Sequence, residues 1–215
     1  MPIEQPRTIW TPAATPRAVL LLGHGAGSPM TTPFLGAFAT AIAELGVSVL
    51  RFDFPYVEAG RKAPDRAPVL VEATCRAFDL AVARADGLPV LAGGRSMGGR
   101  IASMATAEGM PAAGLVFLAY PLHPPGRPEK IRDAHLYGIA APMLFLQGTR
   151  DPFAQPDLLA AVLGRLGDRA EYRPIEGGDH AFRVAGGERD AARIGAALAP
   201  VAADFVERRV LRSQQ

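Results

Sequence analysis

The sequence predicts an α/β fold, in which a doubly wound, mostly parallel sheet carries helices on both of its faces. Short apolar runs alternate with amphipathic or Ala-rich segments along the whole chain, and that alternation is typical of such sheets. The apolar runs are continuous, which favours strands that are buried on both faces. No internal repeat, low-complexity tract or linker divides the 215 residues, so we expect one domain over 1–215.

Six apolar runs are the expected strands, and a seventh near Thr8–Trp10 is only weakly marked. The six are Ala18–Gly23, Val47–Phe52, Pro89–Ala92, Gly114–Tyr120, Pro142–Gln147 and Ala170–Ile175. The expected helices lie between and after them, at Pro33–Leu45, Ala67–Ala85, Met97–Ala107, Pro156–Leu166 and Glu188–Val210. In the last helix we expect Pro200 to kink or split the chain, because proline lacks the backbone N–H that a helix interior uses.

Composition argues against several classes of protein. Hydrophobic residues make up 49% and charged residues 20%, which is ordinary for a globular chain. The net charge is +2 and the basic residues are scattered, so no basic stripe predicts a nucleic-acid partner. The apolar runs are too short to span a membrane, and the N-terminus does not resemble a signal peptide. The single cysteine, Cys75, cannot form an internal disulfide, so we expect a cytoplasmic protein.

A nucleophile candidate follows the expected strand Pro89–Ala92. Gly94, Ser96 and Gly98 form a G-x-S-x-G pattern at a strand-to-helix turn. Such a turn holds the serine hydroxyl above the strand end, and side chains at the two glycine positions would collide with neighbouring backbone. The following helix points its N-terminus at the same place, where it favours negative charge. A tightly packed glycine turn without chemistry is the alternative, and we favour the nucleophile.

A serine hydroxyl needs a base to take its proton, and four histidines are available. His180 comes after the last expected strand, which agrees with the chain order Ser, acid, His of this kind of site. Asp151 leaves the preceding strand and is the preferred acid, where it would orient the imidazole. Asp179 is the rival acid, although sequence neighbours rarely achieve the required geometry.

Small residues follow the first clear strand, in the stretch Gly23-His24-Gly25-Ala26-Gly27. Two backbone N–H groups are needed to hold the oxygen of a tetrahedral intermediate. We expect them to come from Ala26 and from Met97, which follows the nucleophile. His24, Tyr120 and His123 lie at strand ends and are candidate substrate contacts, with a purely structural role as the alternative. Charges in the loop 55–68, at Arg61, Lys62 and Arg66, either meet an acidic substrate or face solvent.

With these residues placed, the stretch 18–210 resembles the α/β hydrolases, in particular the small, lidless serine hydrolases of the dienelactone-hydrolase-like and carboxylesterase-like branch. The resemblance rests on four short stretches, His24–Gly27, Gly94–Gly98, Gly148–Asp151 and Gly178–His180. It implies an α/β-hydrolase fold with a minimal cap, and cleavage of an ester or related acyl bond by Ser96, His180 and Asp151. The nucleophile is Ser where dienelactone hydrolases use Cys, which argues against that substrate.

Two other functions compete with this one. The first is a non-catalytic module of the same fold that binds a partner, because a fold alone does not define a function. The second is a nucleotide-binding oxidoreductase, faintly suggested by Gly23, Gly25 and Asp53, but Ser28 stands where a third glycine is needed. For the main hypothesis we expect a small-molecule acyl substrate and neither a cofactor nor a metal. Neither the substrate's identity nor the oligomeric state follows from the sequence.

Overall fold

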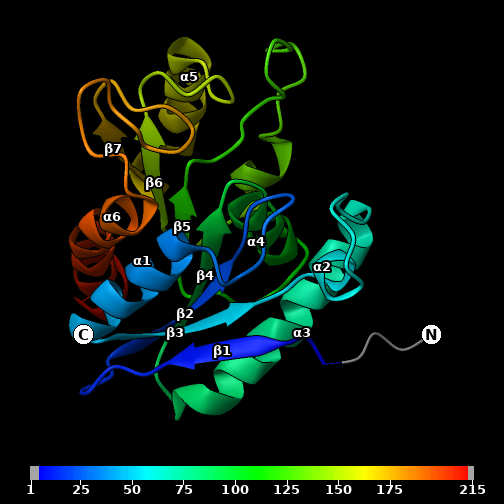
Figure 1. Ribbon diagram of the computed structural model, residues 1–215, viewed down its shortest axis with the longest axis vertical. Helices are drawn as coiled ribbons and strands as arrows, with labels where there is room; N and C mark the ends of the chain where they lie inside the picture. The colour runs from blue at the N-terminus through cyan, green and yellow to red at the C-terminus, as the bar shows by residue number, and fades with distance from the viewer. Residues whose placement is uncertain (1–4, 213–215) are drawn as a thin grey trace.

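The computed structural model describes residues 5–212 and contains seven strands in one sheet. The strands are β1 (Thr8–Thr11), β2 (Ala18–Gly23), β3 (Val47–Phe52), β4 (Val90–Arg95), β5 (Leu115–Leu118), β6 (Met143–Gly148) and β7 (Ala170–Ile175). Their order across the sheet is β1-β3-β2-β4-β5-β6-β7 (Figure 1). β1 runs antiparallel to β3 and every other pair is parallel, which confirms the predicted fold class.

Helices and short turns of helix connect the strands. They are α1 (Pro33–Glu44), α2 (Pro55–Glu58), α3 (Ala67–Ala85), α4 (Met97–Ala107), α5 (Pro156–Leu166) and α6 (Ala191–Val206). Shorter turns are η1 (Ala134–Gly138), η2 (Gly167–Arg169) and the π-helical η3 (Glu207–Leu211). The connection from β5 to β6, residues 119–142, contains η1 and no longer helix (Figure 1).

Two hydrophobic cores lie on opposite faces of the sheet. One packs α3, α4 and α5 against the sheet, with Phe78, Ile101 and Leu159 among its members. The other packs α1 and α6, through residues such as Phe38 and Leu198. Strands β2 to β6 are almost entirely buried between these layers, as their continuous apolar runs predict.

The structure differs from the sequence predictions in the burial of β7 and in the split expected at Pro200. β7 was expected to be buried but is a partly exposed edge strand, and Tyr172 and Arg173 in it are exposed. The helix α6 is not split at Pro200 but runs through it, because the buried residues on either side, such as Leu198 and Ala202, pack against the sheet. This packing outweighs the local preference of an exposed proline.

Several boundaries also differ from those predicted. α6 begins at Ala191 because the carboxylate of Asp190 accepts hydrogen bonds from the backbone N–H groups of Ala192 and Arg193. β4 extends through Gly94 to Arg95, three residues beyond the expected end, so that it leads directly into the turn at Ser96.

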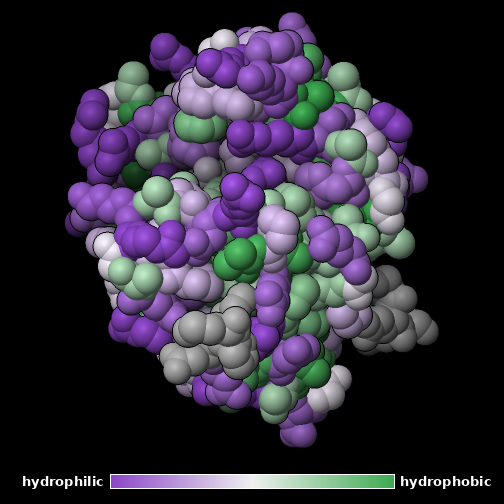
Figure 2. Space-filling view, turned by 90° about the vertical axis from the view of Figure 1, so that its right-hand side faces the viewer, coloured by the Kyte–Doolittle hydropathy of each residue, from purple (hydrophilic) through white to green (hydrophobic). Residues whose placement is uncertain are grey.

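The surface shown in Figure 2 is mostly hydrophilic, with hydrophobic areas that are small and scattered between polar ones. Within residues 5–212, none of the helices combines the length and the apolar character that crossing a membrane requires.

Candidate active site

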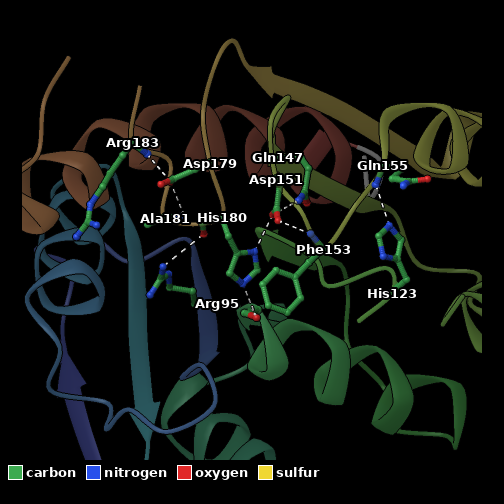
Figure 3. A network of polar contacts seen from close by, with 11 residues as sticks. Arg95, His123, Gln147, Asp151, Phe153, Gln155, Asp179, His180, Ala181 and Arg183 are labelled. Atoms are coloured by element: carbon green, nitrogen blue, oxygen red, sulfur yellow. Dashed lines mark hydrogen bonds and ion pairs between the residues drawn. The ribbon is translucent and has the colours of Figure 1, made fainter. Parts of the chain in front are cut away.

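Four loops meet at the edge of the sheet where the parallel strands end. They follow β2, β4, β6 and β7, and they carry the residues that the sequence singled out. Sites in open α/β sheets form at this edge, because the loops from neighbouring strands converge there. Figure 3 shows His180 and Asp151 turned toward each other at this edge.

Ser96 occupies a strained turn between β4 and α4. Its backbone has φ 49° and ψ −114°, a conformation that residues other than glycine rarely adopt. The Ser96 N–H donates to the carbonyl of Leu118 on β5, at 2.9 Å, which fixes the turn against the sheet. A Cβ atom at Gly94 or at Gly98 would lie 2.4 Å from the carbonyl oxygen of Gly23. The turn therefore requires glycine at both positions, as the motif predicts.

The imidazole of His180 connects the other two predicted residues. Its Nε2 lies 2.8 Å from Ser96 Oγ, and its Nδ1 lies 2.7 Å from Asp151 Oδ2. In the matching tautomer Nδ1–H donates to the carboxylate, and Nε2 accepts from the serine hydroxyl. The ring also packs against Phe153, with ring centroids 4.2 Å apart (Figure 3).

Asp151 is almost fully buried, with 3% of the residue exposed, and is held from two sides. Its Oδ2 accepts from Gln147 Nε2 at 2.6 Å, and its Oδ1 accepts from the backbone N–H of Phe153 at 2.8 Å. Asp179, the rival acid, uses its carboxylate to accept from the backbone N–H groups of Ala181 and Arg183 (Figure 3). The carboxylate beside His180 is therefore that of Asp151.

A pocket of about 240 Å³ opens beside Ser96, and both Ala26 and Met97 line it. Met97 is the first residue of α4, so its N–H has no partner within the helix. The Ala26 loop is held by its neighbours, because the Gly27 N–H donates to the Tyr56 hydroxyl and Ser28 Oγ donates to the Gly25 carbonyl. Both predicted oxyanion donors thus belong to residues around the serine.

His24 is fully buried beneath this loop. Its Nε2 accepts from the Phe54 N–H at 3.0 Å, and its Nδ1 lies 2.8 Å from the Gly25 carbonyl, to which it donates. Both ring nitrogens are used by the fold, and burial lowers the pKa of His24, which keeps the ring neutral. The side chain shapes the loop and is not among the residues lining the pocket.

Tyr120 and His123 are also buried in structural hydrogen bonds. The Tyr120 hydroxyl donates to the Arg132 carbonyl, and His123 Nε2 accepts from the Gln155 N–H. Neither lines the pocket beside Ser96. Their contact with a substrate, like that of His24, stays a sequence prediction that this arrangement does not support.

The structure adds residues that the sequence analysis did not single out. Gln147 supports Asp151, and Phe153 lies between His180 and the pocket. Gln147 had a signal in the sequence, because it is a lone polar residue in an apolar strand. Arg95 extends toward the His180 loop, where its Nη2 donates to the His180 carbonyl at 3.4 Å (Figure 3). Within residues 5–212, no group of three His, Cys, Asp or Glu side chains could hold a metal ion.

The sheet, its helices and the Ser96–His180 pair define a protein of the α/β hydrolase class. The chain belongs to the α/β hydrolase family, because the model of the alpha/beta hydrolase domain matches its residues 16–206.

Solved structures with similar folds include several enzymes. An α/β serine hydrolase without a lid from Xanthomonas campestris is 19% identical, with a TM-score of 0.72, over 94% of this chain and 88% of that one. Dienelactone hydrolase from Anabaena variabilis is 20% identical, with a TM-score of 0.70, over 96% of this chain and 100% of that one. The esterase domain of a Rhodothermus marinus protein is 15% identical, with a TM-score of 0.68, over 96% and 99%. These similarities confirm the predicted fold and the resemblance to lidless hydrolases.

Proposed function

We propose that the protein is a serine hydrolase that cleaves a carboxylic ester, or a related acyl bond, through an acyl-enzyme intermediate. The observation that carries this proposal is the hydrogen-bonded row in which His180 lies 2.8 Å from Ser96 Oγ and 2.7 Å from Asp151 Oδ2. Hydroxyl, imidazole and carboxylate in that row are the groups that activate a serine nucleophile. Similar folds in an esterase domain and in a serine hydrolase without a lid support the choice of reaction.

In the first half of the reaction, Ser96 Oγ attacks the substrate carbonyl while His180 Nε2 takes the hydroxyl proton. The imidazolium is stabilised by Asp151, which accepts the Nδ1–H bond. The backbone N–H groups of Ala26 and Met97 hold the negative oxygen of the tetrahedral intermediate. When that intermediate collapses, His180 returns the proton to the departing alcohol and leaves an acyl group on Ser96.

In the second half, water attacks the acyl group and His180 again takes a proton. Ser96 is released as the leaving group, recovers a proton from His180, and the carboxylic acid departs. Water can reach the acyl group, because Ser96 is partly exposed.

A fluorophosphonate probe followed by peptide mass spectrometry tests the nucleophile. We expect modification of Ser96 and none of Ser103, which also contacts a histidine, His135, but is fully buried. Ser96→Ala should abolish hydrolysis of p-nitrophenyl acetate while the melting temperature stays that of the wild type. Unlabelled folded protein without esterase activity would instead support the non-catalytic binding module.

The two aspartates give a matched pair for testing the acid. Asp151→Asn should lower kcat by about 10⁴-fold, because the amide cannot hold the required tautomer of His180. Asp179→Asn removes the same charge from a carboxylate that only bonds backbone N–H groups, so its effect on kcat should be far smaller. Equal losses in both variants would contradict the assigned role of Asp151.

A further inference from the structure

Two arginines line the pocket beside Ser96, and neither is needed by the proposed mechanism. Arg100 lies in α4, one helical turn after Ser96, and Arg132 comes from the segment between β5 and β6. Residues four apart on a helix lie on the same side, so the start of α4 carries Ser96 and Arg100 toward one pocket. Arg132 is brought there by a chain segment remote in sequence.

The positive charge of the two guanidinium groups is unmatched. None of the ion pairs within residues 5–212 includes either arginine, and the polar contact of Arg100 Nη1 is with Met104 Sδ at 3.4 Å. Both residues line the same pocket, and burial, followed by the positive charge of Arg132, lowers the pKa of Arg100. Arginine nevertheless remains charged at neutral pH.

Two carboxylates, Asp65 and Asp133, lie near these arginines in space or in sequence and have other partners. Asp65 also lines the pocket; its Oδ1 lies 2.6 Å from Arg61 Nη2, and its buried Oδ2 has no hydrogen-bond partner among residues 5–212. Asp133, next to Arg132, accepts a hydrogen bond from the Tyr137 hydroxyl at 2.5 Å. Among the charged residues that line the pocket, Arg100 and Arg132 therefore stand beside a single carboxylate, Asp65, which already pairs with Arg61.

A buried hydrogen-bond network holds the backbones of both arginines. Ser103 Oγ donates to the Arg100 carbonyl at 2.7 Å, and the Tyr120 hydroxyl donates to the Arg132 carbonyl at 2.9 Å. His135 joins these two groups, since its Nε2 lies 2.8 Å from Ser103 Oγ and 3.4 Å from the Tyr120 hydroxyl. Ser103 and Tyr120 are fully buried.

Two like charges that line one pocket disfavour each other, and a bound anion that contacts both offsets that cost. Arginine also offers paired N–H donors that match the two oxygens of a carboxylate. We propose that this pocket selects esters that carry a carboxylate, and that Arg100 and Arg132 bind it. This specificity rests on the proposed hydrolase function. With a volume of about 240 Å³ beside the serine, the pocket fits a short substrate, such as the monoester of a small dicarboxylic acid.

Three chromogenic or ultraviolet-absorbing esters of similar size test the proposal. Mono-p-nitrophenyl glutarate carries the anion on its acyl side, 3-butyryloxybenzoate carries it on the leaving group, and p-nitrophenyl valerate is neutral. After division by the rate of each ester with hydroxide, we expect kcat/KM to be at least about tenfold higher for one anionic ester than for the neutral one. Whichever anionic ester is favoured identifies the side of the substrate that the arginines contact.

Arg100→Gln and Arg132→Gln should each lower this anionic-to-neutral ratio by about tenfold or more. Arg127→Gln is the matched control, because it removes the same charge from an exposed residue of the segment that carries Arg132. The control should leave the ratio unchanged. A wild-type ratio near one, or a ratio that the Arg100 and Arg132 variants do not change, would overturn the proposal while ester hydrolysis stands.

Direct binding separates failure of the specificity from failure of the hydrolase function. Ser96→Ala protein should bind monomethyl glutarate more tightly than neutral methyl butyrate in calorimetric titrations, and adding Arg100→Gln should remove the difference. If the wild type hydrolyses no ester, this measurement still decides the role of the arginines. Equal affinities for the two compounds would overturn it.

Discussion

The nucleophile turn is packed so closely that Gly98 leaves no room for a side chain. A Cβ added there would lie 2.4 Å from the Gly23 oxygen, 2.5 Å from the Gly23 carbonyl carbon and 2.8 Å from the His24 oxygen. All three are backbone atoms, so no side-chain rotation can relieve the contact. An ordinary nonbonded contact is ~3.5 Å, and Gly98→Ala must therefore separate α4 from the loop after β2 by about 1 Å.

Overpacking of this kind destabilises a protein by about 1–3 kcal/mol. At about 2–4 °C for each kcal/mol in a chain of this length, we expect the melting temperature to fall by roughly 2–12 °C. The displaced loop also carries Ala26, a proposed oxyanion donor, and a misplacement of about 1 Å can lower a reaction rate about a hundredfold. Thermal unfolding and kcat with p-nitrophenyl acetate measure the two effects separately.

Gly164 provides the matched control for this substitution. It lies in α5, and a Cβ there would have no atom within 4 Å. Gly164→Ala should therefore stabilise the protein by about 0.5–1 kcal/mol and leave kcat unchanged, since alanine favours a helix interior over glycine. A Gly98→Ala protein with the melting temperature and kcat of the wild type would refute the packing argument.

Two further predictions concern buried polar groups. Gln147→Met removes a donor to Asp151, and it also removes the buried Oε1 that has no partner among the described residues. We expect kcat for p-nitrophenyl acetate to fall about tenfold and the free energy of unfolding to change by less than about 1 kcal/mol. An unchanged kcat would contradict the role of Gln147. In the folded protein, burial lowers the pKa of His24 and of His135 below the ordinary histidine value of 6.5. Below pH 6.5 the unfolded chain therefore binds more protons than the folded one, and the protein loses stability as the pH falls toward 5. In thermal melts over that range, His135→Asn should reduce the slope of melting temperature against pH, and the unaltered slope would show that His135 does not contribute.

The sequence predicted the sheet well where local pattern and burial agree. The runs that became β2 and β3 have their expected bounds because they are apolar throughout and are covered on both faces. The burial of a strand also depends on its position in the sheet, and for β7 the predicted burial was wrong. β7 is exposed because it lies at the edge of the sheet, and the charged Glu171 and Arg173 together with Pro174 are typical of an edge strand, a signal that the prediction of a buried strand did not use.

The residues of the candidate site that could be predicted are those marked by their neighbours in the sequence or by chain order. Ser96 is marked by flanking glycines and by its place after a strand, whereas Asp151 and His180 are marked by chain order. The geometry brings these three together, and their roles remain a proposal. Arg132 could not be found in this way, because its approach to Arg100 depends on the path of a segment without regular repeats. Such a contact is set by tertiary packing, which a local pattern does not record.

The backbone at the carboxyl edge of the sheet is under strain at three places besides glycines. Ser96, Ala119 and Phe182 have φ values of 49°, 61° and 61°, and they follow β4, β5 and β7. Each such residue carries a conformational energy of about 1–3 kcal/mol, which persists only because surrounding structure imposes it. The helices α1 and α6 on one face of the sheet, and α3 and α4 on the other, therefore stabilise these strained residues by packing the sheet that carries them. Their packing supplies the surplus stability that keeps the serine hydroxyl in a position that its own backbone would otherwise leave.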